Sequence, residues 1–89
     1  MEDIGVTPEQ LLANARAFEA EATLIERFAK DDYENAARAY GGGSYAFVRA
    51  IDEADRYMRE ARLLREAAAE QRAGAVELTQ LLKEIEING

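Results

Sequence analysis

Residues 36–48 read AARAYGGGSYAFV and interrupt an otherwise helical sequence, so they set how many helices the chain forms and where they end. Each of the three consecutive glycines, residues 41–43, costs about 1 kcal/mol relative to alanine inside a helix, so a turn is strongly favoured there. Glycine also suits a left-handed helix C-cap, and Ser44 has the side chain of a helix N-cap. We therefore expect a first helix to end near residue 40, a turn over residues 41–44 and a second helix from about residue 45.

The segment before the turn has the pattern of a helix over about residues 8–40. It opens on Thr7-Pro8-Glu9-Gln10, a capping box with proline at the first helical position. Its apolar residues then recur at steps of three and four, which is typical of a helix packed against another helix. The repeat slips at residues 30–32, where a kink and a continuous helix with a stutter fit equally well. The stripe consists of Leu11, Ala15, Phe18, Ala22, Ile25, Ala29, Tyr33, Ala36 and Tyr40.

The segment after the turn carries a second stripe at the same spacing. Gly74 leaves two arrangements open: one long helix that continues through it, or a helix over about residues 45–73 followed by a third over about 75–87. No segment alternates apolar and polar residues as a strand does. The sequence therefore predicts a single all-α domain over residues 1–89, an antiparallel helical hairpin with a possible third C-terminal helix, assembling into a helical bundle. The second stripe consists of Phe47, Ile51, Ala54, Met58, Ala61, Leu64 and Ala68, with Leu78, Leu81, Leu82 and Ile85 beyond Gly74.

Charge and composition exclude several classes of partner. The chain has 11 Lys and Arg against 18 Asp and Glu, a net charge of −7 that repels nucleic acid and anionic membrane surfaces. The longest uncharged stretch, residues 39–48, contains three glycines and is too short to span a bilayer. Residues 1–6 lack the basic and apolar regions of a signal peptide. We expect a cytoplasmic protein, or one secreted without a cleaved signal peptide.

The residue types present argue against catalysis. The chain has neither His nor Cys, which removes the usual base, thiol nucleophile and imidazole or thiolate metal site. Carboxylates alone can hold Mg²⁺, but Asp52 and Asp55 alternate with arginines at salt-bridge spacing, so a solvated charged face is the better interpretation. We expect no enzyme activity, no metal and no cofactor. The carboxylates considered are Glu19, Glu21, Glu26, Asp52, Glu53 and Asp55.

The residues around the turn are the candidates for an interaction site. A tyrosine beside a glycine turn either clamps the turn shut or presents its ring to a partner, and both interpretations of Tyr40 and Tyr45 stay open. The candidates for the turn or an interface are Tyr40, Gly41, Gly42, Gly43, Tyr45, Phe47, Ile51 and Met58.

The stretch from Ala36 to Gly42 resembles the turn of the WxG helical-hairpin family of type VII secretion, the small early-secreted-antigen-like proteins. Tyr40 stands where that family has Trp, and Gly42 stands for its Gly. The resemblance implies two long antiparallel helices, dimerisation into a four-helix bundle and export without a cleaved leader. That family's export signal, a Tyr followed four residues later by an acidic residue, has no counterpart here, since Tyr33, Tyr40, Tyr45 and Tyr57 are followed at that distance by Ala37, Ser44, Arg49 and Ala61.

The apolar stripes are longer than two helices can cover by themselves. This predicts a non-enzymatic protein–protein interaction module, a hairpin that pairs with itself or with a related chain as a homo- or hetero-oligomer. The charge of −7 supports an alternative, an acidic phage-type inhibitor or adaptor that occupies a basic groove on a target protein. A third alternative is a Mg²⁺-dependent all-α nucleotide hydrolase.

Overall fold

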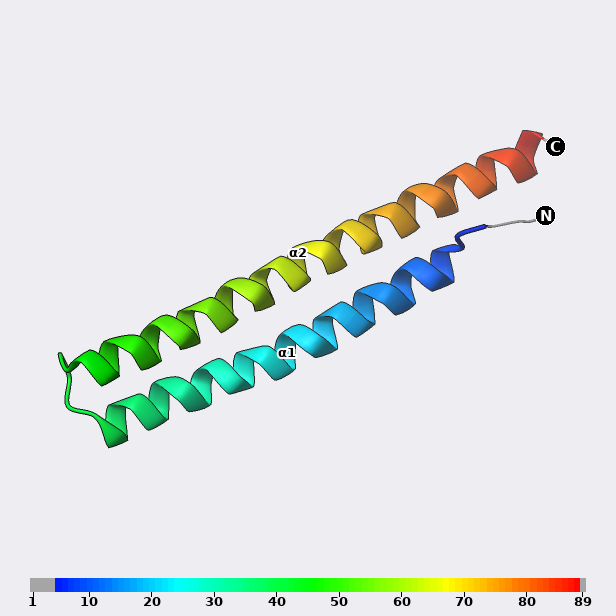
Figure 1. Ribbon diagram of the computed structural model, residues 1–89. Coiled ribbons are helices and arrows are strands. Elements are labelled where there is room, and N and C mark those ends of the chain that lie inside the picture. The colour runs from blue at the N-terminus through cyan, green and yellow to red at the C-terminus, as the bar shows by residue number, and fades with distance from the viewer. Residues whose placement is uncertain (1–4, 89) are drawn as a thin grey trace.

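The protein is a two-helix antiparallel hairpin. The computed structural model describes residues 5–88, with side chains through residue 86. Helix α1 (Pro8–Ala39) and helix α2 (Tyr45–Asn88) run side by side over a body of 68 × 22 × 14 Å (Figure 1). Residues 5–88 contain no strand, so the predicted all-α hairpin is confirmed. Residues 1–4, which belong to the N-terminal stretch without signal-peptide features, and Gly89 lie outside the described residues.

Helix α1 starts with the capping box that the sequence predicts. The Thr7 side chain accepts a hydrogen bond from the Gln10 amide at 3.1 Å, and Gln10 Oε1 accepts one from the Thr7 amide at 3.2 Å. The helix then runs without a break through residues 30–32, so the continuous helix is correct and the kink does not occur.

The turn differs in detail from the expected glycine C-cap. The C-cap is Tyr40, in extended conformation, and its amide donates to the Ala36 carbonyl at 3.0 Å. The left-handed conformation falls instead at Gly43, with φ of 90°, one residue before the Ser44 N-cap of the second helix. Ser44 caps that helix as predicted, because its Oγ accepts a hydrogen bond from the Phe47 amide at 3.1 Å.

Helix α2 is continuous through Gly74, so of the two arrangements left open the single long helix is correct, and the break with a third helix does not occur. The reason is the packing of Gly74 against helix α1. A Cβ built on Gly74 would lie 3.5 Å from Leu11 Cδ1, so this position faces α1 and packs beside Leu11. Local propensity alone predicts a weak point there, whereas packing against the neighbouring helix keeps the segment helical.

The contact between the helices is made of alanine. The fully buried apolar residues of the hairpin are all alanines, and they recur every seventh residue on both helices. A seven-residue repeat keeps one line of each helix against its partner, and small side chains let the two backbones approach closely. We call this line the alanine seam: Ala15, Ala22, Ala29 and Ala36 on α1, and Ala54, Ala61, Ala68 and Ala75 on α2.

Candidate interaction faces

Two ion pairs, one heptad apart, close one edge of the seam. Arg72 binds Glu19 through two hydrogen bonds, of 2.6 and 3.0 Å. Arg65 binds Glu26 in the same bidentate way, at 2.6 and 2.8 Å. Each of these four residues stands four positions after a seam alanine, so they share one side of the hairpin. We call this side the ion-pair face.

The carboxylates of this face are engaged by protein groups. The hydrogen bond from Arg72 lowers the pKa of Glu19, and the hydrogen bond from Arg65 lowers the pKa of Glu26. Nearer the turn, the Tyr33 hydroxyl donates to Asp55, and this hydrogen bond raises the pKa of Tyr33. Three of the carboxylates considered as Mg²⁺ ligands are therefore paired. Among the described residues, no group of three or more acidic side chains is arranged to hold a metal ion.

Large apolar side chains occupy the opposite edge. On each helix they stand three positions after, or four before, a seam alanine, again on a repeat of seven in which Gln71 takes one position on α2. Contacts across this edge include the tilted ring pair of Phe28 and Tyr57, with centroids 6.4 Å apart, and the 3.2 Å hydrogen bond from Asn14 to Gln71. We call this side the apolar face; its central residues are Leu11, Phe18, Ile25, Tyr57, Leu64 and Leu78, all half-buried.

The apolar surface extends to the far end of α2. This helix continues past the start of α1, so its last turns have no neighbouring helix in the hairpin (Figure 1). Leu81 is 54% exposed and Ile85 66% exposed. We call residues 81–86 the distal segment. Leu82, 46% exposed, adds to the apolar surface of this segment.

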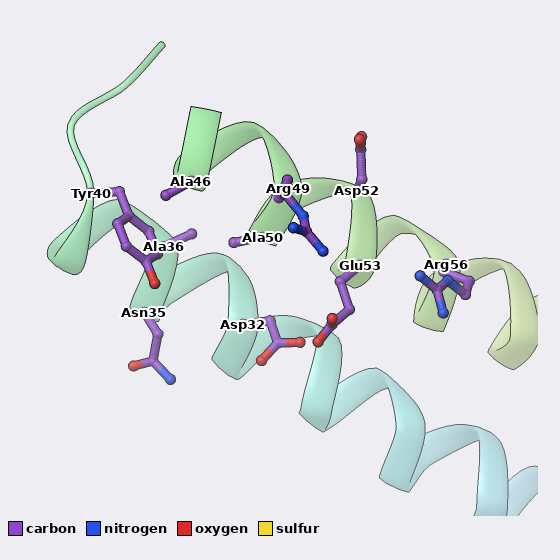
Figure 2. Close-up of a pocket in the computed structure, with 10 residues that line it drawn as sticks. All are labelled: Asp32, Asn35, Ala36, Tyr40, Ala46, Arg49, Ala50, Asp52, Glu53 and Arg56. Carbon is purple, nitrogen blue, oxygen red and sulfur yellow. The ribbon is translucent and has the colours of Figure 1, made fainter. Parts of the chain in front are cut away.

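A hollow of about 600 Å³ lies at the other end, beside the turn (Figure 2). Alanines form its floor, because Ala36, Ala46 and Ala50 leave space between the helices. Charged residues from both helices stand around this turn-end hollow: Asp32 on α1, and Arg49, Asp52, Glu53 and Arg56 on α2, with Asn35 and Tyr40 completing the lining.

The eight residues predicted around the turn do not form one site. Tyr40 lines the turn-end hollow, whereas Tyr45 is 77% exposed and lies 6.0 Å below the Arg49 guanidinium. Met58 lies on the ion-pair face, in a shallow hollow with Arg65 and Glu26. The three glycines form the turn itself, with open space around Gly41, Gly42 and Gly43, and Phe47 and Ile51 are half-buried near it.

Sequence reasoning missed the division of the hairpin into two unlike faces. The sequence indicates this division through three sets of residues spaced seven positions apart: the seam alanines, the pair Glu19 and Glu26, and the pair Arg65 and Arg72. Both members of each pair stand four positions after a seam alanine, and the pairing of Glu19 with Arg72 and of Glu26 with Arg65 sets the register of the two helices.

Comparison of the chain with protein-family models, curated proteins and solved structures gives no match. Within the described residues, neither helix is both long and apolar enough to cross a membrane.

Proposed function

We propose that this protein is a non-enzymatic interaction module whose hairpin completes its hydrophobic core against another helical protein chain, a second copy or a related one. The observation that carries the proposal is the alanine seam. Because alanines alone are fully buried, every large apolar side chain of the described hairpin keeps part of its surface in water. A partner packed on the apolar face removes that surface from water, which is the main driving force of association.

The exposed area supports the same proposal. A compact protein of this mass exposes about 5200 Å². This chain exposes 6501 Å², an excess of about 1300 Å² over that compact reference. A standard protein–protein interface buries about 800 Å² on each partner, so the excess is large enough to supply one.

The resemblance to the WxG hairpins belongs to this proposal. Two long antiparallel helices, a glycine turn and an unfilled core fit a module of that kind, paired in a four-helix bundle and exported without a cleaved leader. Tyr40, which stands for the family's Trp, lines the turn-end hollow and so lies where a partner's side chain would contact it.

Substitution of one residue on each face tests the proposal. Leu64→Asp places a charge on the apolar face and is expected to abolish self-association measured by light scattering. Met58→Asp, on the ion-pair face of the same helix, is the matched control and is expected to leave self-association intact. Helix content of both variants is followed by circular dichroism. If both variants lose self-association equally, or if neither loses it, the assignment of the binding face would be wrong.

The net charge of −7 favours a second candidate, an acidic inhibitor or adaptor that binds a basic groove on a target protein. Such binding weakens steeply as salt rises, because screening removes the long-range attraction. Apolar helix pairing persists at high salt, so a salt titration of binding separates the two candidates.

A further inference from the structure

We infer that the partner is a second copy of this chain, packed in the opposite direction, so that the distal segment of each copy fills the turn-end hollow of the other. The inference rests on the proposed function and adds the identity of the partner and its orientation.

The two ends of the hairpin have complementary shapes. At one end the last turns of α2 extend beyond the start of α1 (Figure 1), and Leu81 and Ile85 there are 54% and 66% exposed. At the other end small side chains, Ala46 and Ala50 among them, leave the turn-end hollow (Figure 2). A two-fold axis across the apolar face, level with Glu66 and Ala67 of α2, exchanges the two ends. This axis brings the distal segment of each copy to the turn-end hollow of the other, so the two copies form a closed symmetric dimer.

Charges along α2 select the same arrangement. Every seventh residue from position 49 forms one line on the helix, which reads Arg49, Arg56, Leu63, Glu70, Glu77 and Glu84. The line is basic near the turn and acidic near the far end. When two copies of α2 pack antiparallel along this line, Arg49 of one copy lies beside Glu84 of the other. Arg56 likewise lies beside Glu77, and both contacts occur at each end of the dimer. Complementary charges of this kind fix the register of an interface.

A dimer in which both hairpins point the same way lacks these features. The two turn-end hollows would face each other and stay unfilled. Both distal segments would extend beyond the start of α1 covered only by each other, and Arg49 and Glu84 would each lie beside the same residue of the other copy. The antiparallel dimer removes both defects with the same two-fold axis.

Cross-linking tests the orientation directly, because the chain contains no cysteine. Copies carrying Arg49→Cys are mixed with tagged copies carrying Glu84→Cys and oxidised. Each copy then carries a single cysteine, so every disulfide joins two chains. Positions 49 and 84 are 35 residues apart in α2, roughly 50 Å, so the mixed disulfide cannot form if both hairpins point the same way. We expect the mixed 49–84 disulfide to dominate. The matched control, Leu24→Cys mixed with Glu84→Cys, is expected to give no more than background cross-linking.

Charge reversal provides an independent measurement. Arg49→Glu with Arg56→Glu is expected to weaken the dimer by about ten-fold or more in the dissociation constant, since each repulsion occurs twice. Adding Glu77→Arg and Glu84→Arg is expected to restore the affinity.

The outcomes separate this inference from the proposed function. A dimer that Leu64→Asp disrupts but that gives no 49–84 disulfide would overturn the antiparallel arrangement and leave the interaction module in place. A chain that is monomeric at every concentration would overturn pairing with a second copy altogether.

Discussion

Alanine is the smallest side chain with high helix propensity, and its use at eight seam positions sets how closely the two helices pack. Ala61, with no exposed surface, has no room for a larger group. We expect Ala61→Leu to destabilise the fold by about 1–3 kcal/mol, because the helices must separate or the side chain must adopt a strained rotamer. Urea unfolding followed by circular dichroism measures this. Ala20→Leu, on the exposed side of α1, is the control and should change stability by less than about 0.5 kcal/mol.

The ion pairs of Glu19 and Glu26 make stability depend on pH. Their pKa values are lowered in the folded state, so the folded state binds protons less readily than the unfolded chain does. The stabilisation is therefore complete above the ordinary glutamate pKa, about 4.3, and is lost as the pH falls below it through the lowered values. We expect the melting temperature of Glu19→Gln with Glu26→Gln to fall less between pH 6 and pH 3 than that of the unchanged chain. Glu34→Gln with Glu60→Gln serves as the control; an equal effect of both pairs would contradict the role of the ion pairs.

Among the elements, α2 shows most clearly how contacts between helices override local sequence. Gly74 is the weakest helix former in the interior of α2, yet the helix continues through it beside Leu11. A Cβ there would make ordinary van der Waals contact at 3.5 Å. We expect Gly74→Ala to stabilise the hairpin by about 0.5–1 kcal/mol, since alanine loses less conformational freedom in a helix. Thermal unfolding measures the change, and a lower melting temperature would show that Gly74 is needed for close packing or a bend.

What the sequence predicts at this scale depends on how local the information is. The capping box at Thr7 and the turn at residues 41–44 are encoded by adjacent residues, and both are correct. The continuity at Gly74 depends on Leu11, 63 positions away in sequence, and the ion pairs depend on a register between helices. A single sequence gives the spacing of Glu19, Glu26, Arg65 and Arg72, but only the packed hairpin shows which residues meet.

At the scale of the whole molecule, the hairpin has one face closed by ion pairs and one left apolar. The residues predicted as an interaction site were chosen around the turn, because the glycines indicate the turn. The apolar face runs along both helices, so these residues lie near only part of it. This asymmetry is the physical reason for expecting a four-helix bundle: two apolar faces buried against each other leave two ion-pair faces in water.

Light scattering on a size-exclusion column, at low and at high salt, measures whether the hairpin pairs through its apolar face. We expect a particle of twice the 9.9 kDa chain mass that persists at high salt, because apolar burial holds it together. A particle of 9.9 kDa at every concentration, or a dimer that dissociates as salt rises, would contradict pairing through the apolar face.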